Sequence, residues 1–140
     1  MRLGKIIASV NNKKNAYLNN QLKKTGLSYG QALTINAIHL YGEIQQDMIV
    51  KELEIDKSAV TRILKTLEER GFIIKKMCQS DHRIYNITLT KKGEEVYPLI
   101  HHILKNMKKT MLKGITDEEK ELLVQLLFKI RDNLENDYEQ

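Results

Sequence analysis

IDKSAVTRILKTLEERGFIIKKMCQSDHRIYNITLTKKG, residues 55–93, decides the fold, because it encodes a helix, two short strands and the start of another helix. Asp56 stands where a helix N-cap belongs, since its carboxylate can accept from free amides of the first turn. Apolar residues then recur with the spacing of one helix face: Val60, Ile63, Leu64 and Leu67. Gly71 is expected to end the helix, because glycine adopts a positive φ without strain.

The opposite face of this helix carries hydroxyl and basic side chains, the types that bind base edges and phosphates. They are Lys57, Ser58, Thr61, Arg62, Lys65 and Thr66. On an isolated amphipathic helix, such a face is more often simply solvated. The hairpin that follows favours DNA binding instead.

A hairpin is predicted by two runs rich in β-branched and aromatic residues, 72–77 and 84–89. The segment that joins them, residues 78–83, is longer than a tight turn and is expected to project. Lys75 and Lys76 place positive charge on the first strand.

The tip of the hairpin carries Asp81, His82 and Arg83. An arginine at a projecting tip suits the narrow, electronegative minor groove of DNA. Asp81 is placed to orient that arginine through a charge-assisted hydrogen bond. A helix sized for the major groove followed by such a wing predicts a winged helix-turn-helix that binds double-stranded DNA.

The run DHRIYNITLTKKG, residues 81–93, resembles the wing signature of the MarR family of bacterial transcription regulators: Asp-x-Arg, then Leu-Thr-x-x-Gly. Residues 55–73 resemble the family's recognition helix, and the similarity extends back through residues 27–56. The resemblance implies a mainly α fold with a small β-hairpin wing and N- and C-terminal dimerisation helices. Glu54 departs from the family pattern, because a glycine is common at this turn and another residue at positive φ carries a cost.

A chain of 140 residues is expected to form one domain. Within it, residues 28–90 are the predicted DNA-binding lobe, and residues 1–27 and 91–140 the predicted helical dimerisation region. The last predicted helix carries an apolar stripe: Leu122, Leu123, Leu126, Leu127, Ile130, Leu134 and Tyr138.

Such a stripe must be buried against something. Helices from both chain ends can interlock with a second copy, which predicts a homodimer on a pseudo-palindromic operator. The alternative is a monomer that folds its terminal helices onto its own core.

The net charge of +5 is unevenly distributed along the chain. Residues 1–27 carry six positive and no negative charges, whereas residues 114–140 carry three positive and eight negative. This polarity predicts one side that faces DNA and an acidic tail directed elsewhere.

Other classes of protein find little support in the sequence. It contains no run of about 18 apolar residues, so no membrane helix is expected. The single cysteine and the absence of a signal-peptide pattern favour a cytoplasmic protein. The four histidines lack metal-ligand spacing, and no nucleophile–base, Walker or dinucleotide motif is present. We therefore expect neither a metal, nor a cofactor, nor enzymatic activity.

The family resemblance implies that small aromatic or phenolic effectors bind between the lobe and the dimerisation helices. Amphipathic rings suit a mixed pocket, and the candidate lining residues are Tyr17, Tyr29, His39 and Tyr41. The same rings are also explained as ordinary core or interface aromatics. The predicted function is a homodimeric, sequence-specific repressor that a small ligand releases from DNA.

Two alternatives stay open. One is a winged-helix module for protein contacts, although its wing would be expected to be apolar rather than basic. The other is a redox-sensing regulator that acts through Cys78, whose pKa the nearby Lys75 and Lys76 would lower.

Overall fold

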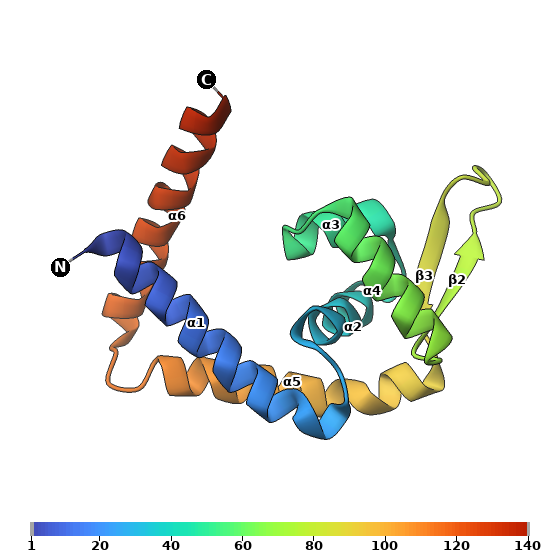
Figure 1. Ribbon diagram of the computed structural model, residues 1–140, viewed down its shortest axis with the longest axis horizontal. Coiled ribbons are helices and arrows are strands. Elements are labelled where there is room, and N and C mark those ends of the chain that lie inside the picture. Colours follow the sequence, from blue (N-terminus) through green and yellow to red (C-terminus); the bar gives the residue numbers. More distant parts are fainter. Residues whose placement is uncertain (1, 140) are drawn as a thin grey trace. The chain divides into compact units, whose positions relative to one another are not determined.

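The computed structural model describes residues 2–139, with side chains described through Asp137. Its elements are α1 (Leu3–Leu22), the 3-10 turn η1 (Lys23–Thr25), α2 (Tyr29–Tyr41), β1 (Ile44–Gln45), α3 (Gln46–Leu53), α4 (Lys57–Glu69), β2 (Ile73–Met77), β3 (Tyr85–Leu89), α5 (Lys91–Met111) and α6 (Asp117–Glu139) (Figure 1). The predicted mainly α fold with a small β-hairpin wing is confirmed.

The chain divides into two compact units, residues 1–107 and residues 108–140. The predicted lobe of residues 28–90 lies inside the first unit. The core of that unit also includes Leu18 and Leu22 from α1, and Ile100 and Ile103 from α5. The helix-turn-helix elements and parts of the flanking helices therefore share one apolar core.

Side-chain caps set where several helices begin. At α2, Ser28 Oγ accepts from the backbone N–H of Gln31 at 3.2 Å, and Gln31 Oε1 accepts from the backbone N–H of Ser28 at 3.0 Å. Thr116 and Glu119 form the same reciprocal pair at the start of α6. Each pair satisfies amides that the first helical turn leaves without partners.

The turn between α3 and α4 places Glu54 in the left-handed region, with φ 52° and ψ 42°. Among residues 2–139, it is the only non-glycine residue with a positive φ. Its backbone N–H donates to Val50 O at 3.0 Å, so the turn is closed by a regular hydrogen bond. The backbone strain at a non-glycine residue here is about 1–2 kcal/mol.

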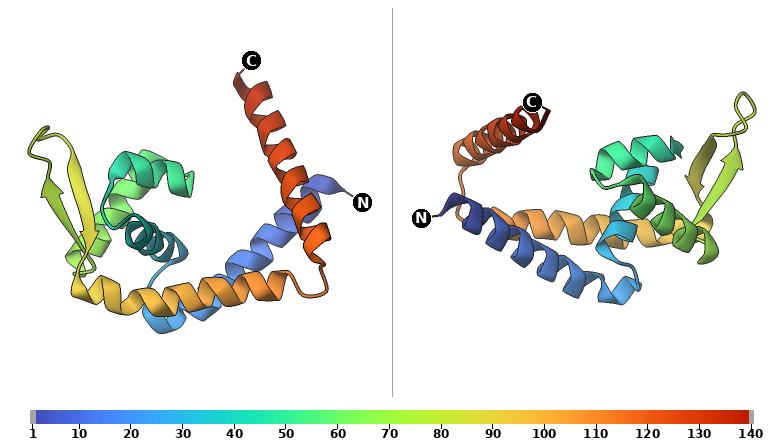
Figure 2. Two further views of the ribbon diagram at one scale, coloured as in Figure 1. Left: turned by 180° about the vertical axis from the view of Figure 1, so that it is seen from behind. Right: turned by 45° about the horizontal axis from the view of Figure 1, so that its top comes forward.

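The three strands form an antiparallel sheet in the order β1-β3-β2. β2 and β3 are each one residue shorter than predicted, because Phe72 and Ile84 belong to turns. Phe72 N–H donates to Leu67 O at the end of α4, and Ile84 N–H donates to Asp81 O in the wing loop. Ile87 of β3 is buried in the core, and the β2–β3 hairpin extends away from the start of α5 (Figure 2).

The base of the hairpin is fastened to the start of α5. Thr90 N–H donates to Phe72 O at 3.0 Å, and Thr90 Oγ1 donates to Gly71 O at 2.6 Å. α5 approaches so closely that a Cβ built on Gly93 would lie 2.4 Å from Phe72 O and 3.1 Å from Leu89 Cβ. The Leu-Thr-x-x-Gly signature thus has a physical cause, since a threonine bonds the turn and a glycine admits the neighbouring backbone.

Two cations over the Phe72 ring add to this junction. Lys92 Nζ lies 4.4 Å and Arg70 Cζ 5.2 Å from the ring centroid. Lys92 Nζ also donates to Arg70 O at 2.6 Å, and Arg70 Nη1 donates to Gly26 O at 3.0 Å. The end of α4, the base of the wing, the start of α5 and the turn before α2 are therefore joined.

Each unit carries an apolar helix face that the described chain leaves exposed. On α1, the residues are Leu3, Ile6, Ile7 and Val10. On α6, they are Leu122, Leu123, Val124, Leu126, Leu127, Phe128 and Leu134. Tyr138, the last member of the predicted stripe, lies outside the residues whose side chains are described. Within residues 2–139, no helix combines the length and the apolar character needed to cross a membrane.

Candidate nucleic-acid interface

The polar face predicted for α4 is present on this helix. Val60, Leu64 and Leu67 are buried in the core, which turns the other side of the helix outward. Five of the six predicted contact residues on α4 are exposed, and Thr66 is half-buried. The exposed residues are Lys57, Ser58, Thr61, Arg62 and Lys65.

Hydrogen bonds hold the first turn of α4. Asp56 Oδ1 accepts from Ala59 N–H at 2.7 Å, which confirms Asp56 as the N-cap. Ser58 Oγ donates to the same carboxylate oxygen at 2.6 Å. The hydrogen bond from Ser58, with that from Ala59, holds the pKa of the Asp56 carboxyl below its usual range.

The wing tip has the predicted ion pair. Arg83 Nε lies 3.1 Å from Asp81 Oδ1, and Arg83 Nη2 lies 3.2 Å from Asp81 Oδ2. These bonds lower the pKa of the Asp81 carboxyl. The Arg83 side chain is still 90% exposed, so the pair adds little stability but sets the direction of the guanidinium. His82 beside it is also exposed.

The two lysines of β2 differ. Lys76 is exposed, whereas Lys75 is half-buried with its Nζ 3.9 Å from Glu68 Oε1 on α4. Lys75 thus links the wing to the end of the recognition helix, a contact that the sequence analysis did not identify.

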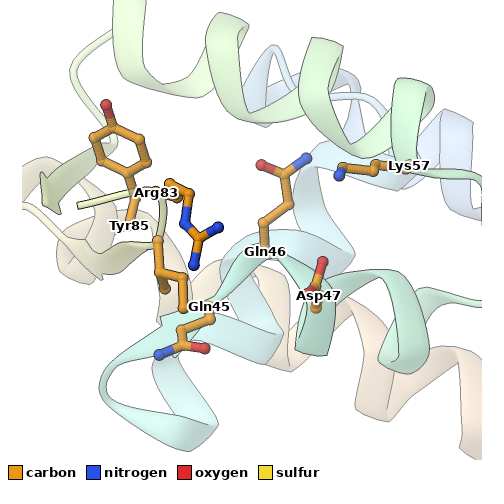
Figure 3. Close-up of a pocket in the computed structure, with 7 residues that line it drawn as sticks. Gln45, Gln46, Asp47, Lys57, Arg83 and Tyr85 are labelled. Atoms are coloured by element: carbon orange, nitrogen blue, oxygen red, sulfur yellow. The ribbon is translucent and has the colours of Figure 1, made fainter. Parts of the chain in front are cut away.

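Gln46 is a further residue at this surface that the sequence analysis missed. It begins α3, and its Nε2 donates to Thr61 Oγ1 on α4 at 2.8 Å. A cleft of about 150 Å³ is lined by Gln45, Gln46, Asp47, Lys57, Arg83, Ile84 and Tyr85. Figure 3 shows the Gln46 amide between the side chains of Arg83 and Lys57. The cleft therefore connects the wing to the recognition helix.

The four rings considered for effector binding are not gathered at one point. Tyr29 and Tyr41 begin and end α2, which separates them by about 18 Å along the helix axis. Tyr29 is half-buried beneath Lys14, whose Nζ is 5.6 Å from the ring centroid. Tyr17 of α1 is half-buried as well.

The other two rings already have close partners. His39 stacks on Tyr97 of α5 with ring centroids 3.5 Å apart, and its Nδ1 lies 3.0 Å from Glu94 Oε2. Tyr41 donates to Glu52 Oε1 at 2.5 Å. That hydrogen bond to a carboxylate raises the pKa of Tyr41.

Cys78 is half-buried at the start of the wing loop. Its Sγ lies 3.0 Å from Ser80 Oγ, and the hydrogen bond to Ser80 is the main cause of a lowered thiol pKa. Backbone amides of Ser80 and Asp81 lower it further, whereas the charge of Asp81 raises it. The wing loop itself therefore lowers the pKa of Cys78, rather than Lys75 and Lys76 as proposed from the sequence.

Comparisons with known proteins place the chain in a family. The MarR family model matches residues 25–84. The HTH-type transcriptional regulator YybA of Bacillus subtilis (strain 168), itself described as uncharacterized, is 33% identical over 121 residues, which cover 86% of this chain and 81% of that protein. The chain therefore belongs to the MarR family of transcriptional regulators, which are not enzymes.

Solved structures agree with this assignment. The transcriptional regulator SlyA superposes with a TM-score of 0.89 at 27% identity, covering 99% of this chain and 98% of that chain. A mutant of E. coli MarR complexed with operator DNA gives a TM-score of 0.83 at 27% identity, covering 91% and 92%. The winged helix-turn-helix assignment is confirmed.

Proposed function

We propose that this protein is a homodimeric repressor that binds a pseudo-palindromic operator in double-stranded DNA. The observation that carries the proposal is the joint orientation of two elements, the exposed polar face of α4 and the Arg83 guanidinium braced by Asp81, on either side of one cleft. α4 enters the major groove, and Arg83 enters the adjacent minor groove. The operator DNA bound by the E. coli MarR mutant supports the choice of partner.

The proposed contacts divide into two groups. Those on α4 are Lys57, Ser58, Thr61, Arg62, Lys65 and Thr66. Those on the wing are Lys75, Lys76, Asp81, His82 and Arg83. Arg62 is the candidate base reader, because a guanidinium binds guanine O6 and N7 together. The lysines bind phosphates and contribute affinity without sequence preference.

The test is a fluorescence anisotropy titration with DNA from upstream of the gene and an unrelated duplex, each at two salt concentrations. We expect preference for the upstream DNA by about 10³-fold or more. Arg83→Ala should weaken operator binding by about ten-fold or more without lowering the melting temperature. Lys51→Ala is the control, because it removes one exposed positive charge that is neither among the proposed DNA contacts nor on the helices of the proposed dimer.

Three results would count against this assignment. Unchanged operator affinity in Arg83→Ala would remove the wing from the interface. Equal, weak and strongly salt-dependent binding to both duplexes would place the target elsewhere. Binding to neither would favour the protein-interaction module.

The exposed apolar face of α6 is the main support for the proposed dimer. Its exposed apolar residues are between 39% and 68% exposed. At about 100° per residue, they cover an arc of roughly 240° around the helix, more than contact with one neighbouring helix can bury. α1 presents a second apolar stripe beside basic residues, whereas the remaining face of α6 is acidic. Two copies that interlock these helices would bury both stripes and pair opposite charges.

Sedimentation equilibrium tests this dimer directly. The wild-type protein should have twice the monomer mass of 16.3 kDa. Leu127→Glu places a charge in the apolar arc and should shift the equilibrium to monomer. Gln125→Glu adds the same charge outside that arc and should leave the dimer intact. A monomeric wild-type protein, or the same mass for both variants, would contradict the proposed interface.

We also propose that a small aromatic or phenolic effector releases the protein from DNA. The half-buried rings of Tyr17, Tyr29 and His39 support such a ligand, because they offer aromatic faces together with polar edges. Phenol and benzoate serve as probes in the operator titration. Tyr29 and His39 are ten residues apart on α2, about 15 Å along its axis, so one small ligand contacts only one of them. Release of DNA that Tyr29→Ala or His39→Ala weakens would support a site at that ring, and release unaffected by both substitutions would exclude it.

A further inference from the structure

The Thr61 hydroxyl has a fixed hydrogen-bonding role. A threonine side chain has one hydroxyl proton. Thr61 Oγ1 donates that proton to Lys57 O, one helical turn back, at 2.9 Å. The group that faces Thr61 from α3 must therefore be a donor, and the Gln46 amide nitrogen, 2.8 Å away, is one. Together the two bonds leave Thr61 without a proton to offer DNA.

The Ser58 hydroxyl likewise has no proton left to donate to DNA. Its proton is given to the Asp56 carboxylate at 2.6 Å. Both of these exposed hydroxyls therefore have lone pairs but no proton to offer DNA, and Thr61 also carries a methyl group. Donors on this face come from Lys57, Arg62 and Lys65.

The bases differ in how they match such a group. In the major groove, guanine offers only acceptors, N7 and O6. Adenine and cytosine offer an exocyclic amino donor, and thymine offers a methyl group. A hydroxyl that can only accept is therefore matched by adenine and cytosine, and the Thr61 methyl group is matched by the methyl group of thymine. Guanine offers neither a donor nor a methyl group, so two acceptors face each other without a proton between them.

We propose that Gln46 is a positioning residue: its amide holds the Thr61 hydroxyl so that Thr61 offers DNA only a hydrogen-bond acceptor and a methyl group. The protein thereby rejects guanine at the base position that faces Thr61. This inference rests on the proposed insertion of α4 into the major groove. Without Gln46, the bond to Lys57 O alone holds the hydroxyl, and threonine in a helix has two accessible rotamers. The hydroxyl then turns outward and donates its proton to guanine N7 or O6.

The position of Gln46 fits this role. It is the first residue of α3 and is half-buried. Its amide lies between Lys57 and Arg83 in the cleft that joins wing and recognition helix (Figure 3). The neighbouring Gln45 points to a different partner, because its amide nitrogen is 3.4 Å from Asn86 Oδ1 on β3. Two adjacent glutamines thus provide a test position and a matched control.

The experiment is in vitro selection from a duplex library with randomised positions, followed by sequencing, with the wild-type protein and four variants. Gln46→Met removes the amide at nearly constant size, and Gln46→Ala removes the side chain. Thr61→Val keeps the methyl group but removes the lone pairs. Gln45→Met is the control. Selected duplexes that differ at one base pair then give the ratio of affinities directly.

We expect one position in each half-site where wild type rejects guanine by about ten-fold, within the range of a specific base contact. Gln46→Met and Gln46→Ala should reduce that rejection by about five-fold at this position and leave the other positions unchanged. Thr61→Val should change the same position, and Gln45→Met should change none. A purely structural role for Gln46 would instead weaken all sequences alike.

The results separate this inference from the proposed function. If wild type enriches no sequence, the proposed function fails and the inference falls with it. If wild type enriches an operator but the Gln46 and Thr61 variants alter different positions or none, only the role of Gln46 is refuted. A wild-type preference for guanine at the position that Thr61→Val alters would also refute it.

Discussion

Gly93→Ala is the substitution with the clearest structural consequence. The new Cβ would lie 2.4 Å from Phe72 O and 3.1 Å from Leu89 Cβ and Cδ2. The first contact is with backbone, which cannot rotate away as a flexible side chain would. Either α5 or the base of the wing must move by about 1 Å to take this separation from 2.4 Å to the 3.4 Å of an ordinary van der Waals contact.

The expected cost has two parts. Overpacking at a close contact costs about 1–3 kcal/mol. Phe72 O also accepts from Thr90 N–H at 3.0 Å, and weakening that bond adds about 0.5–1.5 kcal/mol. The sum is a loss of about 2–4 kcal/mol in the free energy of unfolding, or roughly 6–12 °C in melting temperature at about 3 °C per kcal/mol.

Urea and thermal unfolding, followed by circular dichroism at one fixed protein concentration, measure this loss. Gly4→Ala is the control, because Gly4 lies on an exposed helix and a Cβ there would meet nothing within 4 Å. That change should be neutral or stabilising by up to about 1 kcal/mol. If Gly93→Ala changed stability by less than about 0.5 kcal/mol, the close approach of α5 to the wing base would be wrong.

Three further predictions concern turns and caps. Glu54→Gly should raise the free energy of unfolding by about 1 kcal/mol, measured by urea titration, because glycine relieves the strain at positive φ; a destabilised variant would contradict this. Asp56→Ala should lower the melting temperature at pH 7. Because the folded pKa of Asp56 is lowered, its stabilisation is present above the unfolded pKa and is lost as pH falls through the folded pKa. The melting temperatures of wild type and variant should therefore converge at acid pH. A difference in melting temperature that stays constant with pH would refute the charge dependence of the cap. Ser80→Ala should slow iodoacetamide alkylation of Cys78 at pH 7, because the main bond that favours the thiolate is lost, and an unchanged rate would assign the lowered pKa elsewhere.

The recognition helix was predictable from the sequence because its signals are local. Asp56 and Gly71 set its ends, and the apolar residues between them follow one face. The capping pair of Ser28 and Gln31 is equally local, because the two residues are three positions apart in the sequence. Signals of this kind need no knowledge of how distant elements pack.

Three contacts that the sequence did not predict join separate elements. Gln46 and Thr61 are 15 residues apart, and their hydrogen bond depends on the angle between α3 and α4. Lys75 meets Glu68 only because β2 runs back past the end of α4. The stacking of His39 on Tyr97 requires α2 to cross α5 at one particular level. Residue type and spacing carry no information about such crossings.

The junction around Phe72 has a mechanical consequence. Hydrogen bonds and stacked cations tie the recognition helix, the wing and the first turn of α5 together, so we expect these parts to move as one rigid body. α5 has 21 residues and is therefore about 30 Å long, so a tilt of about 10° at one end carries the other end through about 5 Å. A small change in the tilt of α5 can thus move the recognition helix and the wing together by more than the length of a hydrogen bond, without unfolding any helix.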